Sequence, residues 1–562
     1  MKSFLKKVLN SPIRLILILS TVAIITFSAT VAEDYFEISK NMEIFTSVYK
    51  ELNIYYVDET KPGALMKTGI DAMLRSLDPY TVYYPESKIE DAMFMQTGQY
   101  GGIGTLVNTI DGKITVTEPY QGYAAVKSGL MAGDVIVKVD GKSVEGKHHD
   151  EIGDLLTGNP GSKVDITIRR SGETSDRTIA ITREEIKIPD VPFFSMLDDG
   201  NTGYIKLTGF TQTASAEVKS AFQELKKKNM TRLVLDLRGN GGGLLREAIN
   251  IVNFFVPKGT EIVRTKGKIE EWNKTYTGLN EPLDTSIPIV VLVDGMSASA
   301  SEIVSGSLQD LDRAVVLGEE SYGKGLVQQT KDVAYNSKMK LTVAKYYTPS
   351  GRCIQRLDYS HRDDGTGRVN AVADSLIKPF KTKAGRTVYD GRGIAPDVEV
   401  KQDEASHILA GLVEHWVAFH WVTDFRQKHE TIDSAATFKL SDSDYDAFMK
   451  YAAGQKFEYE TGTEKLYEEL KKVAKEEKYY EGAEGEFDKL FTRIAPQKES
   501  DLIKFKKQIR EFLENEIVSR YYYQDGRAKN ALPGDICIMK AKEVLNTNYA
   551  SLLQGPPGGK KK

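Results

Sequence analysis

The sequence VLVDGMSASASEIVSGSLQD, residues 291–310, decides how the central part of the chain folds. It begins with an apolar run typical of a buried strand, passes through small residues, and ends in an apolar stretch that predicts a helix. A serine at the start of such a helix lies where backbone N–H groups and the helix dipole favour negative charge, as an alkoxide or oxyanion requires. Helix capping by Ser297 or Ser299, completed by Glu302, explains the same residues without chemistry, and local features alone favour it.

Apolar strands and amphipathic helices alternate on both sides of this stretch, from about residue 190 to residue 401. This alternation is typical of an α/β domain with a buried sheet. The strands are expected at Tyr204–Leu207, Leu233–Leu237, Ile287–Val293 and Ala314–Leu317, and the helices at Ala214–Lys227, Leu244–Phe255 and Ser299–Gln309.

A chain of 562 residues is expected to contain about three to five folding units. Short alternating runs separated by turns follow residue 97, and helical periodicity precedes that point and returns after residue 402. We therefore predict a multidomain α+β protein. Its parts are a signal or anchor helix at 1–35, a helical segment at 36–96, a β-rich domain at 97–186, the α/β core at 190–401, a helical region at 402–550 and a disordered tail at 551–562.

Residues 15–32 form an uncharged apolar run that follows four basic residues and precedes Glu33 and Asp34. Its length lies between that of a signal peptide and that of a membrane-spanning helix. Basic residues before the run and acidic residues after it orient the rest of the chain away from the cytoplasm. We expect an exported protein of the periplasm or cell envelope. The residues leave open a cleaved signal, and we favour an anchor in the inner membrane.

The overall composition excludes several classes of protein. The 75 basic and 79 acidic side chains give a net charge of −4 without a basic cluster, which argues against a nucleic-acid-binding protein. Two cysteines, Cys353 and Cys537, cannot by themselves build a disulfide framework or a zinc site, and the sequence does not decide whether they pair. No histidine lies between His149 and His361, so a histidine-based triad has no local support.

Two further glycine-rich segments follow predicted strands of the α/β domain. Lys324 lies between two glycines, and a lysine in a dry pocket loses part of its preference for the charged form, so its neutral amine can accept a serine proton. The run Gly239–Gly243 allows backbone N–H groups to approach an oxyanion. Gly318 and Gly323-Lys324 nearly form a phosphate-binding loop. However, Gly325 replaces the required Ser or Thr, and Leu326–Gln329 reads as a strand, so we reject a nucleotide site.

The β-rich domain opens with Gly101-Gly102-Ile103-Gly104. A glycine-flanked loop beside a strand exposes N–H groups that can receive a chain-terminal carboxylate, while the strand edge extends the bound peptide. Together with Gly129-Leu130 and the segment 133–141, these residues resemble a PDZ domain. The alternative is that the glycines serve only tight turns.

In combination, the motifs of residues 38–401 resemble the C-terminal processing (tail-specific) proteases, peptidase family S41. The segments that carry this resemblance are Leu77–Thr81, Asp236–Gly243, Ser299–Val304, Leu308–Asp310, Arg313-Ala314, Gly323–Gly325, Val327-Gln328 and Gly393–Asp397. The resemblance implies a crotonase-like α/β protease core with a PDZ domain inserted ahead of it. The sequence departs from many members at Thr157, where an arginine is usual, and this leaves gating by the PDZ domain in doubt.

The same resemblance implies the roles of individual residues. Ser299 becomes the nucleophile because it precedes the lysine by the family's spacing, Lys324 the general base, and Gln328 the residue that orients the lysine. The oxyanion is expected to be held by the backbone N–H of Ala300 and of a glycine such as Gly241 or Gly242. The PDZ residues Gly101, Gly102, Ile103 and Gly104 are expected to bind the peptide. No metal or cofactor is implied.

The function implied is an exported serine endopeptidase that grips the apolar C-terminus of a protein and cleaves it with a Ser–Lys dyad through an acyl-enzyme. The rival is a PDZ scaffold of the cell envelope with an inactive or inhibited protease domain. A crotonase-like thioester enzyme is a weaker alternative, because export and a PDZ domain argue against coenzyme A substrates. The C-terminal helices are expected to pack on the parent domain, with an adaptor or a homo-oligomer contact as the alternative.

Overall fold

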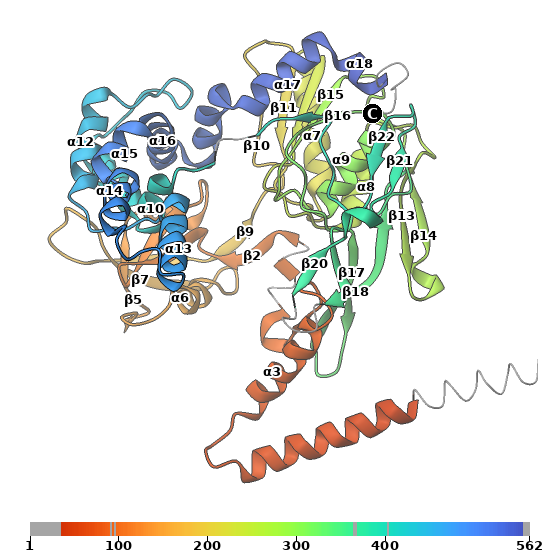
Figure 1. Cartoon of the computed structure of the whole chain (residues 1–562), viewed down its shortest axis with the longest axis horizontal. Helices are drawn as coiled ribbons and strands as arrows, with labels where there is room; N and C mark the ends of the chain where they lie inside the picture. The colour runs from red at the N-terminus through yellow and green to blue at the C-terminus, as the bar shows by residue number, and fades with distance from the viewer. Residues whose placement is uncertain (1–34, 90–92, 95–96, 363–367, 402–403, 555–562) are drawn as a thin grey trace, which may run out of the picture. The chain divides into compact units, whose positions relative to one another are not determined.

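The computed structural model describes residues 35–89, 93–94, 97–362, 368–401 and 404–554 (Figure 1). The chain divides into two compact units, Met1–Tyr83 and Tyr84–Lys562. No helix among the described residues is long and apolar enough to cross a membrane. The predicted anchor at 15–32 lies outside the described residues.

The first unit contains a helix over residues 35–55 and the helix α3 (Pro62–Arg75). The predicted turn after α3 is closed by Asp78, whose Oδ1 accepts hydrogen bonds from the N–H groups of Tyr80 and Thr81, both at 2.8 Å. The helical prediction for 36–96 is wrong at β1 (Val82–Tyr84). This short strand is rich in β-branched and aromatic residues and stands between Pro79 and Pro85, which helices avoid.

A six-stranded sheet forms the centre of the second unit, with the strand order β10-β11-β12-β15-β16-β23. The strands from β11 to β23 run parallel, and β10 is antiparallel. Their bounds are β10 (Phe193–Met196), β11 (Thr202–Lys206), β12 (Arg232–Asp236), β15 (Ile289–Val293), β16 (Val315–Gly318) and β23 (Val398–Glu399). The strands predicted for the α/β core are therefore present, within a few residues.

Both faces of this sheet are covered, as is usual for parallel strands. Leu233 and Leu235 of β12 belong to one apolar cluster with the helices α7 (Ala214–Lys227), α8 (Leu245–Asn253) and α9 (Ala300–Asp310). Val234, between them, packs on the other face against α17 (Ile536–Thr547) (Figure 1). The alternation along the strand places successive side chains on opposite faces.

The C-terminal helices α17 and α18 (Tyr549–Gln554) thus cover the sheet of the α/β core, although the sequence-based division ends that core at 401. The predicted tail at 551–562 is wrong for residues 551–554, which are helical. Leu552 and Leu553 pack against the sheet cluster, and the helix-breaking Gly555-Pro556 comes only afterwards. The remainder of the predicted tail lies outside the described residues.

A second group of strands stands beside the α/β core: β13 (Glu261–Gly267), β14 (Lys274–Thr277), β17 (Leu326–Asp332) and β18 (Lys338–Tyr347). β18 pairs antiparallel with both β13 and β17. The segment after Gly325 is therefore a strand, as predicted when the phosphate-loop interpretation was rejected.

The β-rich domain has the strand order β3-β4-β5-β7-β8 around a separate apolar core. Its elements are β3 (Thr105–Ile110), β4 (Lys113–Pro119), α5 (Ala124–Lys127), β5 (Val135–Val139), α6 (His149–Leu156), β7 (Lys163–Arg169) and β8 (Arg177–Thr182). β2 (Gln99–Gly102) pairs with β9 (Glu184–Lys187) at the point where the chain enters and leaves this domain.

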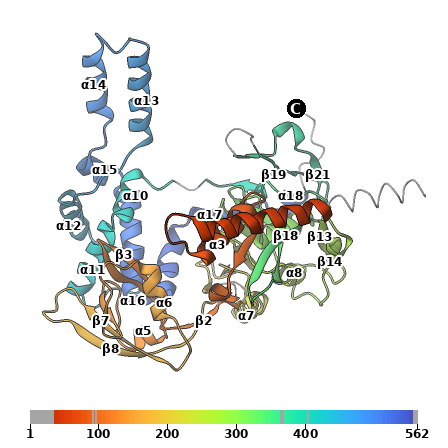
Figure 2. The same cartoon turned by 90° about the horizontal axis from the view of Figure 1, so that it is seen from below.

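The helical region has its own apolar cluster, built from α10 (His407–Glu414), α11 (Val417–Lys428), α12 (Asp442–Ala453), α15 (Lys498–Lys504) and α16 (Lys506–Ala531). The helices α13 (Gly462–Glu476) and α14 (Glu484–Ile494) form a hairpin that projects from the rest (Figure 2). The predicted helix 502–521 is broken at Phe505, and α16 contains a second break at Tyr523, whose φ of 56° and ψ of −153° are not helical.

Candidate active site

The residues predicted to carry the chemistry line one cavity of about 400 Å³, here called the serine cavity. It lies between the start of α9, the loop after β12 and the strands β17 and β18. Its lining includes the whole predicted set for this part of the chain, namely Gly241, Gly242, Ser299, Ala300, Lys324 and Gln328. Segments that are distant in sequence therefore meet at the carboxyl end of the central sheet.

Ser299 stands immediately before α9 with φ of 56° and ψ of −112°. A positive φ is unfavourable for a residue with a side chain and persists only where the surroundings impose it. Here the backbone N–H of Ser299 donates to Oε2 of Glu302 at 2.7 Å, and its carbonyl accepts from the Tyr346 hydroxyl at 3.1 Å. The strained backbone places a half-buried serine at the edge of the serine cavity.

The neighbouring serines have different surroundings. The Ser297 hydroxyl donates to the carbonyl of Leu237 at 2.9 Å, and the Ser301 hydroxyl donates to the carbonyl of Asn240 at 2.8 Å. Both side chains are fully buried, and neither lines the serine cavity. Ser297 and Ser301 therefore fasten the loop after β12 to the start of α9, whereas Ser299 faces the cavity.

Glu302 organises the backbone around the cavity. Its Oε1 accepts from the Ser321 hydroxyl at 2.6 Å and from Gly323 N at 2.7 Å, and its Oε2 accepts from the N–H groups of Ser299 and Lys324 at 2.7 and 2.9 Å. Burial raises the pKa of Glu302, while these four hydrogen bonds act to lower it. One carboxylate thus holds the backbones of Ser299 and Lys324 together.

The glycine loop comes close to the start of α9. A side chain at Gly242 would lie 2.7 Å from the carbonyl oxygen of Ala298 and 2.9 Å from the nitrogen of Ala300, and its φ of +98° also favours glycine. The Ala300 N–H belongs to the first turn of α9, where N–H groups lack helical acceptors. The Gly242 N–H donates to Oδ1 of Asn240 at 2.9 Å, so this candidate oxyanion donor already has an acceptor in the present conformation.

Lys324 reaches the cavity from a tightly packed turn. A side chain at Gly323 would lie 2.6 Å from Cβ of Arg356, and one at Gly325 would lie 2.8 Å from the nitrogen of Gln355. The Gly325 N–H donates to Oε1 of Gln355 at 2.8 Å. The flanking glycines therefore permit the close backbone contacts that fix the position of Lys324.

Gln328 and a second lysine line the same cavity. The side-chain amide of Gln328 donates to the Thr342 hydroxyl at 3.3 Å, and the pairing of β17 with β18 shifts its register beside Gln328. Such irregularities re-aim side chains. Lys340 of β18 also lines the cavity, and burial lowers its pKa. Its proximity to Ser299 was not visible in the sequence, because it depends on the β17–β18 pairing.

The Asp236-Leu237-Arg238 segment directly precedes the glycine loop. Burial would raise the pKa of Asp236, but Arg238 and Lys206 hold it at about 2. Arg238 forms two hydrogen bonds with Asp236 and two with Asp535, the residue that caps α17. This segment, which the sequence shows only as the start of the glycine motif, also joins the core sheet to the C-terminal helices.

The predicted peptide-binding glycines of the β-rich domain adopt a tight bend. Gly101 and Gly102 end strand β2, and the carbonyl of Gly101 accepts from Gly158 N at 3.0 Å. Ile103 is buried, and Gly104 has a φ of +77° with no room for a side chain beside Tyr123. The bend leads into β3, which lies beside α6: the Thr109 hydroxyl is 3.2 Å from Nδ1 of His149.

Two other groups of side chains have the chemistry to bind a metal ion or to act as a nucleophile. Among the described residues, potential metal ligands cluster at His148, His149 and Asp150. These three are consecutive and mostly exposed at the start of α6, an arrangement that needs no metal. Cys353 and Cys537 form no disulfide bond in the described part of the chain, and burial raises the pKa of Cys353, which disfavours its reactive thiolate.

Comparison with known proteins matches three family models to this chain. They are peptidase family S41 over residues 201–359, a PDZ domain over 101–181, and the C-terminal helical domain of probable PDZ-proteases over 408–545. The carboxy-terminal-processing protease of Bartonella bacilliformis is 36% identical over 320 residues, which cover 56% of this chain and 73% of that protein. The chain belongs to the carboxy-terminal-processing proteases of peptidase family S41.

A probable CtpA-like serine protease of Staphylococcus aureus is also 36% identical over 317 residues, covering 56% of this chain and 62% of that protein. Among solved structures, the photosystem II D1 C-terminal processing protease is 27% identical with a TM-score of 0.34, covering 64% of this chain and 92% of that one. The predicted family, PDZ domain and serine-type protease class are thereby confirmed, as is the mixed α and β fold class.

Proposed function

We propose that this serine-type protease cleaves peptide bonds with a Ser299–Lys324 dyad. The observation that carries the proposal is that Ser299, unlike Ser297 and Ser301, lines the cavity that Lys324 also lines. The Glu302 carboxylate, which binds the backbone N–H groups of both residues, supports it by fixing the distance between their main chains. An activated serine requires a base within reach, and such preorganisation supplies it.

In the proposed reaction, neutral Lys324 accepts the Ser299 hydroxyl proton while the serine oxygen bonds to the peptide carbonyl carbon. The negative oxygen is stabilised by the Ala300 N–H and by an N–H of the glycine loop. The peptide C–N bond then breaks, and the lysine ammonium returns its proton to the leaving amine. Water attacks the remaining ester by the same route in reverse and releases the new C-terminus, so that Ser299 is regenerated.

The Gly242 N–H is one candidate donor to the oxyanion, and it is already hydrogen-bonded. Because this N–H donates to Asn240 in the present conformation, using it for the oxyanion requires a small rotation of the Gly241–Gly242 peptide. Gln328 is proposed to orient Lys324 by accepting a lysine N–H at its Oε1, while its Nε2 keeps the hydrogen bond to the Thr342 hydroxyl. The rotation of the Gly241–Gly242 peptide is local and is expected on substrate binding.

We propose that the PDZ domain delivers substrates by binding their C-termini at the bend Gly101–Gly104 and along β3. The matched PDZ family model and the edge position of β3 next to β4 support this mode, in which a peptide adds to a sheet edge. An apolar C-terminus is the proposed substrate feature. Export, with residues 15–32 as an inner-membrane anchor or cleaved signal, completes the proposal.

The test is mass spectrometry of a model protein ending in apolar residues, incubated with the full chain or with Ser299→Ala. A matched substrate ending in acidic residues controls for recognition of the C-terminus. We expect fragments from the wild type alone and mainly from the apolar-ended substrate. Binding of the substrate without cleavage by either protein would instead favour the scaffold function. Equal cleavage of the two substrates would contradict recognition of the C-terminus by the PDZ domain.

A further inference from the structure

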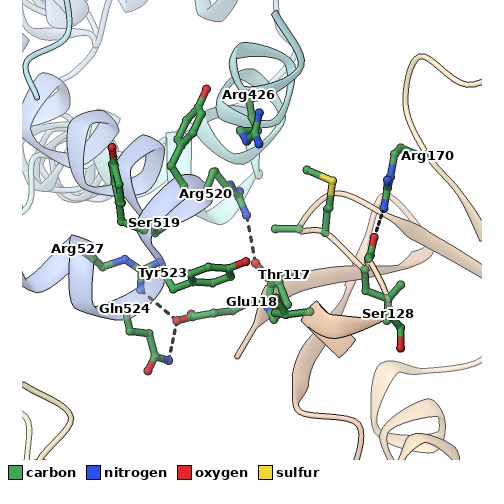
Figure 3. Close-up of a pocket in the computed structure, with 18 of the residues that line it drawn as sticks. Thr117, Glu118, Ser128, Arg170, Arg426, Ser519, Arg520, Tyr523, Gln524 and Arg527 are labelled. Carbon is green, nitrogen blue, oxygen red and sulfur yellow. Dashed lines mark hydrogen bonds and ion pairs between the residues drawn. The ribbon is translucent and has the colours of Figure 1, made fainter. Parts of the chain in front are cut away.

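A second cavity, of about 660 Å³, lies between the PDZ domain and the helical region (Figure 3). It is here called the arginine cavity, after Arg170, Arg177, Arg426, Arg520 and Arg527, which line it. The PDZ side is formed by the end of β4 and the segments beside α5 and β8, and the helical side by α11 and α16. It is separate from the serine cavity and from the bend Gly101–Gly104, since it shares no lining residue with either.

Arg520 lines this cavity from α16. One of its nitrogens, Nη1, donates to the carbonyl of Thr117 at 3.2 Å, and its guanidinium lies 4.4 Å from the centre of the Phe419 ring. Its Nε and Nη2 atoms are buried without a hydrogen-bond acceptor in the part of the chain that the structure describes. Burial and the charge of Arg527 lower the pKa of Arg520 to about 10. Buried donors in this state are rare, because each costs free energy.

Two acidic residues near Arg520, Glu118 and Glu516, already contact other groups. Glu118 accepts from Nε2 of Gln524 at 2.8 Å and lies 3.6 Å from Nη1 of Arg527, while Glu516 lies 3.3 Å from Nη2 of Arg527. Figure 3 shows the contacts of Glu118 with Gln524 and Arg527 on one side of the cavity, with Arg520 and Arg426 above them. The Nε atoms of Arg426 and Arg527 are also buried without an acceptor among the described residues.

The backbone at the cavity is strained as well. Tyr523, which lines the cavity, interrupts α16 with a φ of 56° between Arg520 and Arg527. Non-glycine residues in such conformations cluster where a protein holds a ligand, because the surrounding structure must impose them. The break, the buried guanidinium and the cavity therefore occur at the same place.

We propose that the arginine cavity binds a small oxyanion ligand, with a carboxylate or phosphate group held by Nε and Nη2 of Arg520 once the guanidinium turns these two buried atoms toward the cavity. These two nitrogens form the planar fork that matches both groups. Arg426 and Arg527 supply further donors and positive charge. The volume suits a small molecule rather than a folded partner. Because β4 and α16 both line the cavity, the ligand would join the PDZ domain to the helical region.

Isothermal titration calorimetry of the full chain tests this, with pyrophosphate and citrate as probes and sodium chloride matching the ionic strength. We expect saturable binding of at least one probe, and the better one identifies the group as phosphate or carboxylate. Arg520→Met should weaken that binding at least tenfold, because it removes charged hydrogen bonds. Arg169→Met, in an exposed ion pair with Asp176 outside the cavity, should leave it unchanged. Absence of binding by both probes, or equal affinity in Arg520→Met, would overturn the proposal.

Thermal unfolding separates this role from a structural one. If Arg520 awaits a ligand, Arg520→Met should unfold at the wild-type temperature or above it without added anion, and should lose the rise in melting temperature that the better probe gives the wild type. A lowered melting temperature together with an undiminished rise would assign Arg520 a structural role instead. Arg520→Lys keeps the charge but not the fork. It should bind the probe more weakly than the wild type even if Arg520→Met does not fold, and wild-type affinity in Arg520→Lys would contradict the proposed fork.

Discussion

Glu302 and Arg520 are charged side chains that line or adjoin a cavity and carry buried polar atoms, but their hydrogen-bonding environments are opposite. Glu302 accepts four hydrogen bonds from two segments of the chain, Ser299 and residues 321–324, so its buried carboxylate is fully solvated by the protein. Arg520 donates one hydrogen bond to a backbone carbonyl, and two of its nitrogens have no acceptor among the described residues.

The comparison of Glu302 with Arg520 shows that the effect of a buried charge depends on its hydrogen-bond partners. A charge whose partners are complete stabilises and positions its neighbours, and removing it leaves several unsatisfied groups. A charge whose partners are incomplete costs free energy until a ligand supplies them. The backbones of Ser299 and Lys324 are thus held in place before any substrate arrives, whereas the arginine cavity is complete only with its ligand.

The largest expected effect tests whether the serine cavity is the catalytic one. Lys324→Arg should lower kcat by about 10⁴-fold, because an always-charged guanidinium cannot accept the serine proton. Lys340→Arg provides the matched control, since Lys340 lines the same cavity and burial lowers its pKa. It should keep kcat within about tenfold of the wild type. A larger loss in Lys340→Arg than in Lys324→Arg, measured by steady-state cleavage, would assign the base to Lys340.

The second effect concerns Glu302 itself. In Glu302→Gln the new amide NH₂ cannot accept, so two of the four donors lose their acceptor. The free energy of unfolding in urea should fall by about 3 kcal/mol. Turnover should fall by about 10²-fold because Ser299 and Lys324 are held less firmly. Arg520→Met is the contrasting variant and should show no loss of stability. If both variants lose stability equally, then Glu302 and Arg520 do not differ in how completely their hydrogen bonds are satisfied.

The smallest effect tests the glycine loop of the serine cavity. Gly242→Ala should lower the free energy of unfolding by about 1–3 kcal/mol, because the new Cβ meets Ala298 and Ala300 at a positive φ. Gly241→Ala should change it by no more than about 0.5 kcal/mol, since nothing lies within 4 Å of a side chain there. Equal losses in the two variants would show that the close approach at Gly242 is not what the loop requires.

The fold of the α/β core was largely predictable from sequence, because its strands are buried on both faces and appear as continuous apolar runs such as residues 289–293. Ser299 and Lys324 could be chosen as the dyad only through the family resemblance, since helix capping explained the serine locally. Their shared cavity is consistent with that choice.

The rest depended on contacts between distant segments. The sequence showed Glu302 only as a capping residue, because three of its four donors lie later in the chain, at Ser321, Gly323 and Lys324. Lys340 joins the cavity through strand pairing, and the hydrogen-bond acceptor of Arg520, the Thr117 carbonyl, lies in the PDZ domain, far away in the chain. The helix α18 was missed because its stability comes from the sheet that it covers.

The central claim is that Ser299 is the nucleophile and that Ser297 and Ser301 are structural. One measurement tests it most directly: cleavage rate and melting temperature of Ser299→Ala, Ser297→Ala and Ser301→Ala, side by side on one substrate. We predict that Ser299→Ala loses cleavage but keeps the wild-type melting temperature. The other two should still cleave but unfold at lower temperature, because each loses a buried hydrogen bond between the start of α9 and the loop after β12. Cleavage that persists in Ser299→Ala and disappears in either neighbour would contradict the account.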